Sequence, residues 1–233
     1  MPCTLPASLA DAAVCRGSFH AVLGGEAGEA VFADFSAALQ KAQAEGRILT
    51  ASLFRYENHL FFYAEGLNRP FTPQGLCPAL EAALLPWPPA LGEAAPRPWA
   101  AMQPYFYHDV PTTAADWQQG RCPQRRRGRI ALLPPDSWCS YMEHHLRIVT
   151  EGLVEGDRWH LICVQEGVLF SYLEEPRTNV NIKHQPGAHS PELDAWIAAD
   201  PESHFARFTP EQKAHPDSGH NFVFLPRIAG TED

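Results

Sequence analysis

The stretch PDSWCSYMEHHL, residues 135–146, places a tyrosine and a histidine four positions apart, at Tyr141 and His145. In a helix this spacing puts both side chains on one face, since residues four apart are neighbours there. An imidazole can give and take a proton near neutral pH, and a phenol can donate a hydrogen bond. The pair therefore suits acid–base chemistry on a small bound molecule, with both residues as catalytic candidates.

The element that must position this pair is a helix predicted from residue 137 to about 153. Asp136 follows a proline and is a suitable N-cap, because its carboxylate can accept from the free backbone N–H groups of the first turn. Helical periodicity then places four side chains on one stripe that faces a sheet: Trp138, Tyr141, His145 and Ile148.

A strand predicted at 159–164, WHLICV, supplies a partner for the helix. His160 shares a face of that strand with Ile162 and Val164. Either a polar cluster or a ligand pocket can lie between His145 and His160. Ordinary packing of a buried Tyr/His pair is the alternative, provided that both rings find hydrogen-bond partners.

The chain as a whole makes one pattern twice. Each pass reads β-α-β-β-α-β, and laying LFFYAE (60–65) over LFSYLE (169–174) gives an offset of 109 residues. The expected elements of the first pass are strands at 18–23, 48–54, 59–65 and 101–108, with helices at 29–45 and 77–85. Those of the second are strands at 129–133, 159–164, 168–175 and 221–228, with helices at 137–153 and 191–208.

This order predicts an α+β fold made of two tandem ferredoxin-like repeats, packed sheet to sheet as a pseudo-dimeric α+β barrel. Several strands are apolar on both faces, so each sheet needs cover on both sides. The expected organisation is a flexible lead-in at 1–16, a first repeat at 17–110, an Arg-rich linker at 111–128 and a second repeat at 129–230. Five arginines in or beside the linker suit either an anion clamp or a solvated connection, and charge repulsion favours the latter: Arg121, Arg125, Arg126, Arg127 and Arg129.

The net charge of the chain limits the classes of partner that it can bind. Eighteen basic against 27 acidic residues give a net charge of −9, which disfavours nucleic acid and anionic membranes. The six cysteines form no CxxC pair, so we expect reduced thiols. The N-terminus has no basic, apolar leader and no apolar run is long enough to span a membrane, so a cytoplasmic protein is expected. Its form would be a monomeric pseudo-dimer or a homodimer.

Histidines elsewhere in the chain raise the question of a metal. His184 and His189 share one loop, and His215 and His220 flank PDSG before the last strand. Neither pair has carboxylate or cysteine neighbours at ligand spacing, so surface loops are favoured and no metal or other cofactor is expected.

The motif P-D-x-x-x-x-Y-x-x-x-H, here Pro135, Asp136, Tyr141 and His145, resembles the strand-to-helix segment of the L-rhamnose mutarotase family. The hairpin around VLFSYLEE and the segment LDAWIAADPESHFARF are similar to that family's third strand and second helix. The resemblance covers about a hundred residues of the second half. It implies a ferredoxin-like fold that pairs through its sheets, and a cofactor-free isomerase that interconverts the anomers of a small aldose.

Carried over to this chain, the resemblance makes His145 the catalytic acid and Tyr141 a sugar-binding residue. His160 falls near a pocket tyrosine of the family, and Phe205 and Phe208 stand near its tryptophan pair. Trp138 and Trp159 are further candidates to stack on a sugar ring. The first half has Phe32 and Ser36 at the matching positions, so its site is expected to be degenerate.

Two other functions fit the same expected fold. A cofactor-independent monooxygenase would place an aromatic substrate between helices and sheet, against Trp138, Trp159, Tyr172 and Phe205. A non-catalytic barrel that binds a small molecule is the third alternative.

Overall fold

The computed structural model describes residues 6–151, 154–177, 183–184, 187, 189–213, 218–219 and 221–231. The chain forms two compact units, and neither is continuous in sequence. The first unit comprises residues 1–102, 111–123 and 226–233, and the second comprises 103–110 and 124–225.

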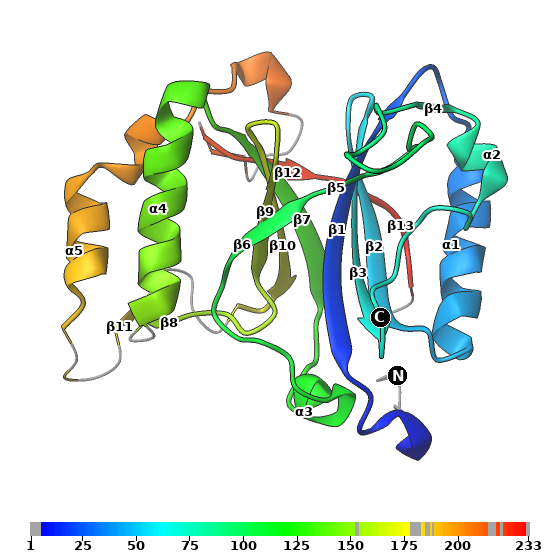
Figure 1. Cartoon of the computed structure of the whole chain (residues 1–233), viewed down its shortest axis with the longest axis horizontal. Helices are drawn as coiled ribbons and strands as arrows, with labels where there is room; N and C mark the ends of the chain where they lie inside the picture. Colours follow the sequence, from blue (N-terminus) through cyan, green and yellow to red (C-terminus); the bar gives the residue numbers. More distant parts are fainter. Residues whose placement is uncertain are drawn as a thin grey trace. The chain divides into compact units, whose positions relative to one another are not determined.

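The first unit is an antiparallel sheet with helices on one face (Figure 1). Its strand order is β13-β2-β3-β1-β4, with β5 also beside β1. The strands are β1 (Val14–Leu23), β2 (Ile48–Tyr56), β3 (His59–Leu67), β4 (Leu84–Leu85), β5 (Ala100–Ala101) and β13 (Arg227–Gly230). The helices are α1 (Glu29–Ala44), α2 (Pro78–Glu81), α3 (Ala114–Gln118) and the 3-10 turn η1 (Ala7–Leu9).

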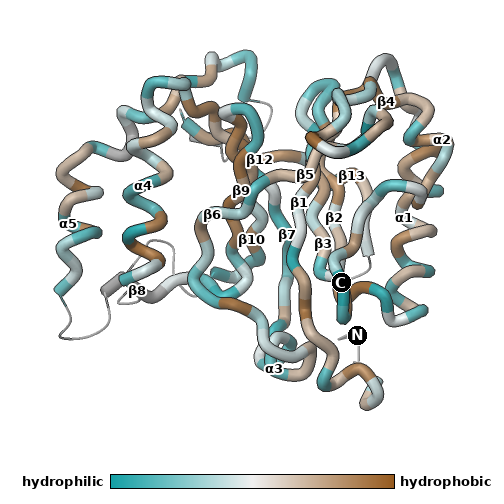
Figure 2. Tube along the Cα trace, in the orientation of Figure 1, coloured by the Kyte–Doolittle hydropathy of each residue, from teal (hydrophilic) through white to brown (hydrophobic). Residues whose placement is uncertain are grey.

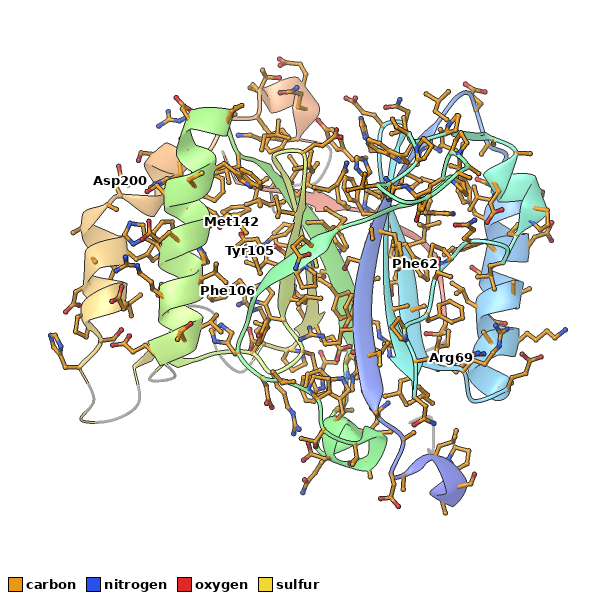
Figure 3. All side chains as sticks on the ribbon, viewed as in Figure 1. Phe62, Arg69, Tyr105, Phe106, Met142 and Asp200 are labelled. Atoms are coloured by element: carbon orange, nitrogen blue, oxygen red, sulfur yellow. The ribbon has the colours of Figure 1, made fainter. Side chains whose placement is uncertain are left out.

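The core of this unit lies between α1 and the sheet. Apolar residues at helical spacing form the buried stripe of α1, Phe32, Phe35, Leu39 and Ala42. Phe62 of β3 points toward this stripe, and its ring meets Phe35 edge to face at 5.7 Å (Figure 3). The expected helix at 29–45 and the hairpin of β2 and β3 are thus confirmed.

The second unit repeats the plan with the strand order β12-β7-β10-β9-β6. Its strands are β6 (Gln103–Tyr107), β7 (Arg125–Leu132), β9 (Leu161–Gln165), β10 (Val168–Glu175) and β12 (Val223–Leu225), and β8 (Val154–Glu155) pairs with β11 (Lys183–His184). The helices are α4 (Pro135–Glu151), α5 (Pro191–Ala198) and the 3-10 turns η2 (Pro201–His204) and η3 (Pro210–Gln212). Figure 2 shows hydrophobic residues along β9, while α4 alternates between hydrophilic and hydrophobic.

Each sheet receives one strand from the other half of the sequence. β6 follows β5 directly, yet it pairs with β9 in the second sheet. β13 follows β12 directly, yet it pairs with β2 in the first sheet. The strands expected at 101–108 and 221–228 are therefore each divided, at residues 102 and 226. Pro226, which cannot donate to a ladder, stands at the second of these breaks.

The sheet faces away from the helices carry a matching polar arrangement. In the first unit the Tyr63 hydroxyl donates to Glu65 at 2.7 Å, and Arg121 donates to both oxygens of Glu65 at 2.7 and 3.0 Å. In the second unit the Tyr172 hydroxyl donates to Glu174 at 2.6 Å, beside Arg126 at 3.6 Å. The two Tyr-x-Glu pairs are 109 residues apart, the offset found in the sequence. Both carboxylates are buried.

The domain boundaries differ from those expected because of this strand exchange. Residues 103–110 join the second unit and 226–233 join the first. The Arg-rich segment is also not a solvated linker: Arg125, Arg126 and Arg127 lie in β7. Arg127 is buried and pairs with Glu175 at 2.9 Å. The arginines find acidic partners on the neighbouring strand, which offsets their mutual repulsion.

Smaller differences concern element ends. The lead-in at 1–16 includes the start of β1, which begins at Val14. The helix α4 begins at Pro135, so Asp136 lies in its first turn and is not the cap; proline is favoured at that first helical position. The helix expected at 191–208 ends at Ala198 and gives way to a 3-10 turn.

The α+β class with antiparallel sheets is confirmed, whereas the tandem duplication stays a prediction. Within the described residues no helix is long and apolar enough to cross a membrane. The cysteines described are all free thiols: Cys15, Cys77, Cys122, Cys139 and Cys163.

Candidate functional site

The inner stripe of α4 carries the expected tyrosine and histidine. Tyr141 is 3% exposed and His145 5% exposed, and both belong to the stripe that Ile148 continues. Trp138 is 42% exposed and does not share their burial, which corrects its place on the sheet-facing stripe. The face that meets the sheet therefore begins one turn later than expected.

The tautomer of His145 is set by a hydrogen bond within its own helix. Its Nδ1 lies 2.9 Å from the backbone carbonyl oxygen of Tyr141. A carbonyl only accepts, so Nδ1 carries the hydrogen and the lone pair of the neutral ring is on Nε2. Nε2 is thus the atom that can take a proton from a bound molecule.

Burial keeps this imidazole neutral. It lowers the pKa of His145 from 6.5 to about 4, although the hydrogen bond to Tyr141 works in the opposite direction. Charges on His144, His204 and His108 would lower the pKa further. At neutral pH His145 is therefore a base: Nε2 carries no proton to give, and the Nδ1 hydrogen is held by the carbonyl of Tyr141.

Aromatic rings surround His145. Tyr141 is 4.1 Å away between ring centroids, Trp196 of α5 is at 4.7 Å and Phe106 of β6 is at 4.9 Å. Trp196 and Phe106 meet it edge to face, and so does Tyr105 at 5.7 Å. Tyr105 and Phe106 lie between α4 and the sheet (Figure 3). The result is an apolar cage with one basic nitrogen.

Tyr141 extends the cage toward the end of α5. Its ring meets Phe205 at 5.1 Å and His204 at 6.0 Å. The phenol of Tyr105 is 6.0 Å away between centroids, and burial, with a smaller effect of Tyr141, raises the pKa of Tyr105 well above 10. Tyr105 therefore stays protonated and can donate a hydrogen bond.

Two further histidines contact the ring of Phe106. The Phe106 ring is 4.9 Å from His108 and 6.1 Å from His160. His160 is 4% exposed and precedes β9, whose Ile162 and Val164 belong to the core under α4. The sequence prediction that His160 faces the helix side of the sheet is consistent with this arrangement, and Phe106 contacts both His160 and His145.

A cavity of about 310 Å³ opens beside the cage. Phe106 and Ile148 form part of its wall, and Ile148 is one helical turn from His145. The remaining lining residues are Tyr107, His108, Asp109, Val110 and Val149. A larger and more open hollow of about 680 Å³ runs along the outer side of α4, past Met142 and Leu146, and does not reach the cage.

The other expected site residues are only partly brought together. Phe205 contacts Tyr141, and Phe208 is buried in the same unit. Trp159 lies in a turn before β9 and is partly exposed. Tyr172 is bonded to Glu174 on the sheet face away from α4, so it does not line the cage.

Sequence reasoning missed five members of the cluster: Tyr105, Phe106, His108, Trp196 and His204. The first three lie on or next to β6, which was assigned to the first repeat. Their alternation in QPYFYH was visible, but its partner strand was not. Trp196 and His204 were visible in the segment similar to the family's second helix, where only the phenylalanines were considered.

Metal-ligand geometry is not found among the described residues, in groups of three or more His, Cys, Asp or Glu. His189 is exposed and pairs with Asp194 at 3.1 Å. His184 lies in β11, and His215 and His220 lie outside the described residues. His20, by contrast, is buried and its Nε2 is 2.8 Å from Nδ1 of His59.

The matching positions in the first unit are occupied by packing residues. Phe32 is buried in the core under α1. The Ser36 hydroxyl accepts from the backbone N–H of Gly230 in β13 at 3.2 Å. α1 thus contacts the exchanged strand β13 through a hydroxyl, where α4 contacts the exchanged strand β6 through His145.

Comparisons with known proteins give structural neighbours only. No protein-family model matches the chain, and no curated protein shows significant sequence similarity. A candidate monooxygenase of Fusobacterium nucleatum aligns over 95% of both chains, with 8% identity and a TM-score of 0.40. An anthrone oxidase-like protein aligns over 94% of this chain and 92% of its own, with 7% identity and a TM-score of 0.38.

Proposed function

We propose that the second unit is a cofactor-independent oxygenase that acts on a flat aromatic compound. The observation that carries the proposal is His145, a neutral imidazole with its lone pair on Nε2, buried in a cage of rings. Aromatic walls favour planar apolar ligands through edge-to-face and stacked contacts.

The proposed reaction begins with removal of a proton by His145. An activated CH₂ group between aromatic rings gives a proton to Nε2 of His145, and the resulting carbanion reacts with dioxygen. The imidazolium returns its proton to the peroxide, which loses water to leave a ketone. One CH₂ compound and one O₂ give one ketone and one H₂O, so the atoms and electrons balance without a further reductant.

The cage assists this reaction in two ways. Tyr105, kept protonated by burial, can donate to an oxygen on the substrate. Exclusion of water strengthens the attraction between the imidazolium and the substrate anion, which compensates for the low basicity of His145. A general base contributes about 10²- to 10⁴-fold to such a step.

The experiment is to follow oxygen uptake with anthrone, whose CH₂ group lies between two rings, and with hydroxylated anthrones, which keep that CH₂ group. Wild-type protein should consume oxygen, and His145→Ala should lower the rate by about 10²- to 10⁴-fold. His144→Ala removes a neighbouring imidazole on the same helix and should leave the rate near that of the wild type. Equal rates for wild type and His145→Ala would overturn the proposal.

Aldose mutarotation remains a second proposal, favoured by the Tyr141–His145 pair with its ring centroids 4.1 Å apart on one turn of α4. Under it, the ligand is a monosaccharide and the tandem repeat acts as a pseudo-dimer. Saturation-transfer NMR of anomer exchange, starting with rhamnose, separates it from the oxygenase. Exchange abolished in His145→Ala, without oxygen uptake, would support mutarotation. A protein that does neither but is stabilised thermally by an aromatic ligand would be a binding module.

A further inference from the structure

The cavity beside the cage has a polar group that nothing in the proposed reaction uses. His108 follows β6 at the cavity wall, and its ring stands edge to face with Phe106 at 4.9 Å. Its nitrogens make no hydrogen bond within the described part of the chain. An unused imidazole next to a cavity is the kind of group that selects a ligand.

The protein makes room for this ring at one position. A Cβ on Gly156 would lie 2.0 to 2.3 Å from Cδ2, Nε2 and Cε1 of His108, far inside any permitted contact. Since Gly156 has no special backbone angle, the close approach of the imidazole is what the absence of a side chain permits. The position of His108 therefore depends on glycine at 156.

The charges around the cavity are already matched. Asp109 pairs with Arg158 at 2.9 Å, and Asp157, which follows Gly156, pairs with Arg177. An anionic ligand would meet Asp109 in the lining, and a cationic ligand would have to displace Arg158 from that carboxylate. His108 itself is uncharged at neutral pH, because burial lowers its pKa below 6.5 despite the nearby Asp157. The remaining lining contributes apolar surface from Phe106, Val110, Ile148 and Val149.

We propose that this cavity binds a neutral hydroxylated aromatic compound, and that His108 recognises its hydroxyl group by a hydrogen bond. The proposal names the substrate class of the proposed oxygenase and rests on the same site, but it concerns binding and not turnover. A volume of about 310 Å³ accommodates two or three fused rings. A neutral imidazole can donate to or accept from a phenol, whereas it gains nothing from an unsubstituted ring.

The test compares three probes of one size: 2-naphthol, naphthalene and 2-naphthoate. Dissociation constants are measured by NMR titration of the full-length protein. For the wild type we expect 2-naphthol to bind about two- to tenfold more tightly than naphthalene, the value of one net hydrogen bond, and 2-naphthoate to bind most weakly. Equal affinities for 2-naphthol and naphthalene would overturn the proposal.

Three variants test whether His108 causes the tighter binding of 2-naphthol. His108→Ala should bring the 2-naphthol affinity to that of naphthalene, with little change for naphthalene itself. Gly156→Ala should do the same by displacing the ring. Gly28→Ala is the matched control, because a Cβ at Gly28 meets nothing within 4 Å. If the preference for 2-naphthol persisted in folded His108→Ala protein, His108 would not be the recognising group.

Failure of this proposal and of the oxygenase proposal can be told apart. His145→Ala should keep the preference for 2-naphthol while oxygen uptake is lost. A preference that depends on His108, without any oxygen uptake by the wild type, would retain the binding site and reject the oxygenase. Oxygen uptake without a preference that depends on His108 would retain the oxygenase and reject the binding site.

Discussion

The rings of Phe106 and His145 meet edge to face with their centroids 4.9 Å apart, although 39 positions separate them in the sequence. Phe106 comes from β6, the strand that the first half of the chain contributes to the second sheet. The candidate base is thus enclosed by a residue from a distant part of the sequence. The Phe106 ring also lines the cavity, so it contacts both the imidazole and the cavity.

Phe106→Ala should enlarge the cavity beside His145 and admit more water to the imidazole. Removal of a buried phenylalanine ring costs about 3 to 5 kcal/mol of unfolding free energy, and we expect a loss in this range from urea denaturation. The pKa of His145, measured by NMR titration of its ring protons, should rise toward 6.5 as water enters. Phe106→Leu, which retains apolar cover, should give a smaller change in both, and an unaltered pKa in Phe106→Ala would show that Phe106 does not shield His145.

Stability should depend on the protonation of His145. Its pKa is lower in the folded state than in the unfolded state, so the unfolded chain binds more protons between pH 6.5 and about 4. The contribution of neutral His145 is fully present above pH 6.5 and is lost as the pH falls through this window. The loss between pH 7 and pH 4 is about 3 kcal/mol for a shift of this size.

The measurement for this pH dependence is the unfolding free energy of the wild type and of His145→Gln at several pH values. Gln cannot titrate, so the difference between the two proteins should shrink as the pH falls from 7 to 4. Parallel pH profiles would contradict the shifted pKa.

Breaking the buried ion pair of Glu65 and Arg121 should strongly destabilise the first unit. Their side chains are 0% and 2% exposed, and burial alone would raise the pKa of Glu65. The charge and hydrogen bonds of Arg121 outweigh burial and lower that pKa. Arg121→Met leaves the carboxylate without its main partner and should cost about 3 to 5 kcal/mol in urea denaturation.

Two variants calibrate the effect of Arg121. The double variant Glu65→Leu with Arg121→Met removes both charges and should be more stable than Arg121→Met alone. Arg47→Ala removes one partner of the exposed pair with Glu45 and should cost less than about 1 kcal/mol. A cost for Arg121→Met as small as that for Arg47→Ala would mean that the charge of Glu65 is not buried in solution.

The two sides of α4 should respond differently to the same substitution. Leu146 is 49% exposed, so Leu146→Lys should change the unfolding free energy by less than about 0.5 kcal/mol. Ile148 is 1% exposed, and Ile148→Lys should unfold the second unit or nearly so, because an unpaired charge would be buried. Circular dichroism during thermal unfolding measures both, and a large effect at Leu146 would indicate that this outer face is covered in solution.

The local part of the site could be predicted from the sequence because it depends on helical geometry. Tyr141 and His145 are four apart, and periodicity alone places them together on the buried face. Trp138 was placed wrongly for a related reason. Spacing says which side chains share a stripe, but not where along the helix the sheet begins to cover it.

The non-local part could not be predicted in the same way. Nothing in the segment QPYFYH says which sheet accepts it, because β6 has no turn that ties it to β9. The arginines of β7 present the same difficulty. A run of like charges indicates a solvated segment unless its acidic partners are known, and Glu174 and Glu175 are 48 residues away from Arg126 and Arg127.

The exchange of β6 and β13 has a consequence for synthesis on the ribosome. β2 needs β13 to cover its edge, and β13 spans residues 227–230, after the whole of the second unit. The edge of β2 in the first unit therefore stays unpaired while the whole second unit is being translated. Open edges pair with strands of other chains, so a nascent chain of this protein is exposed to misassembly until β13 has been translated.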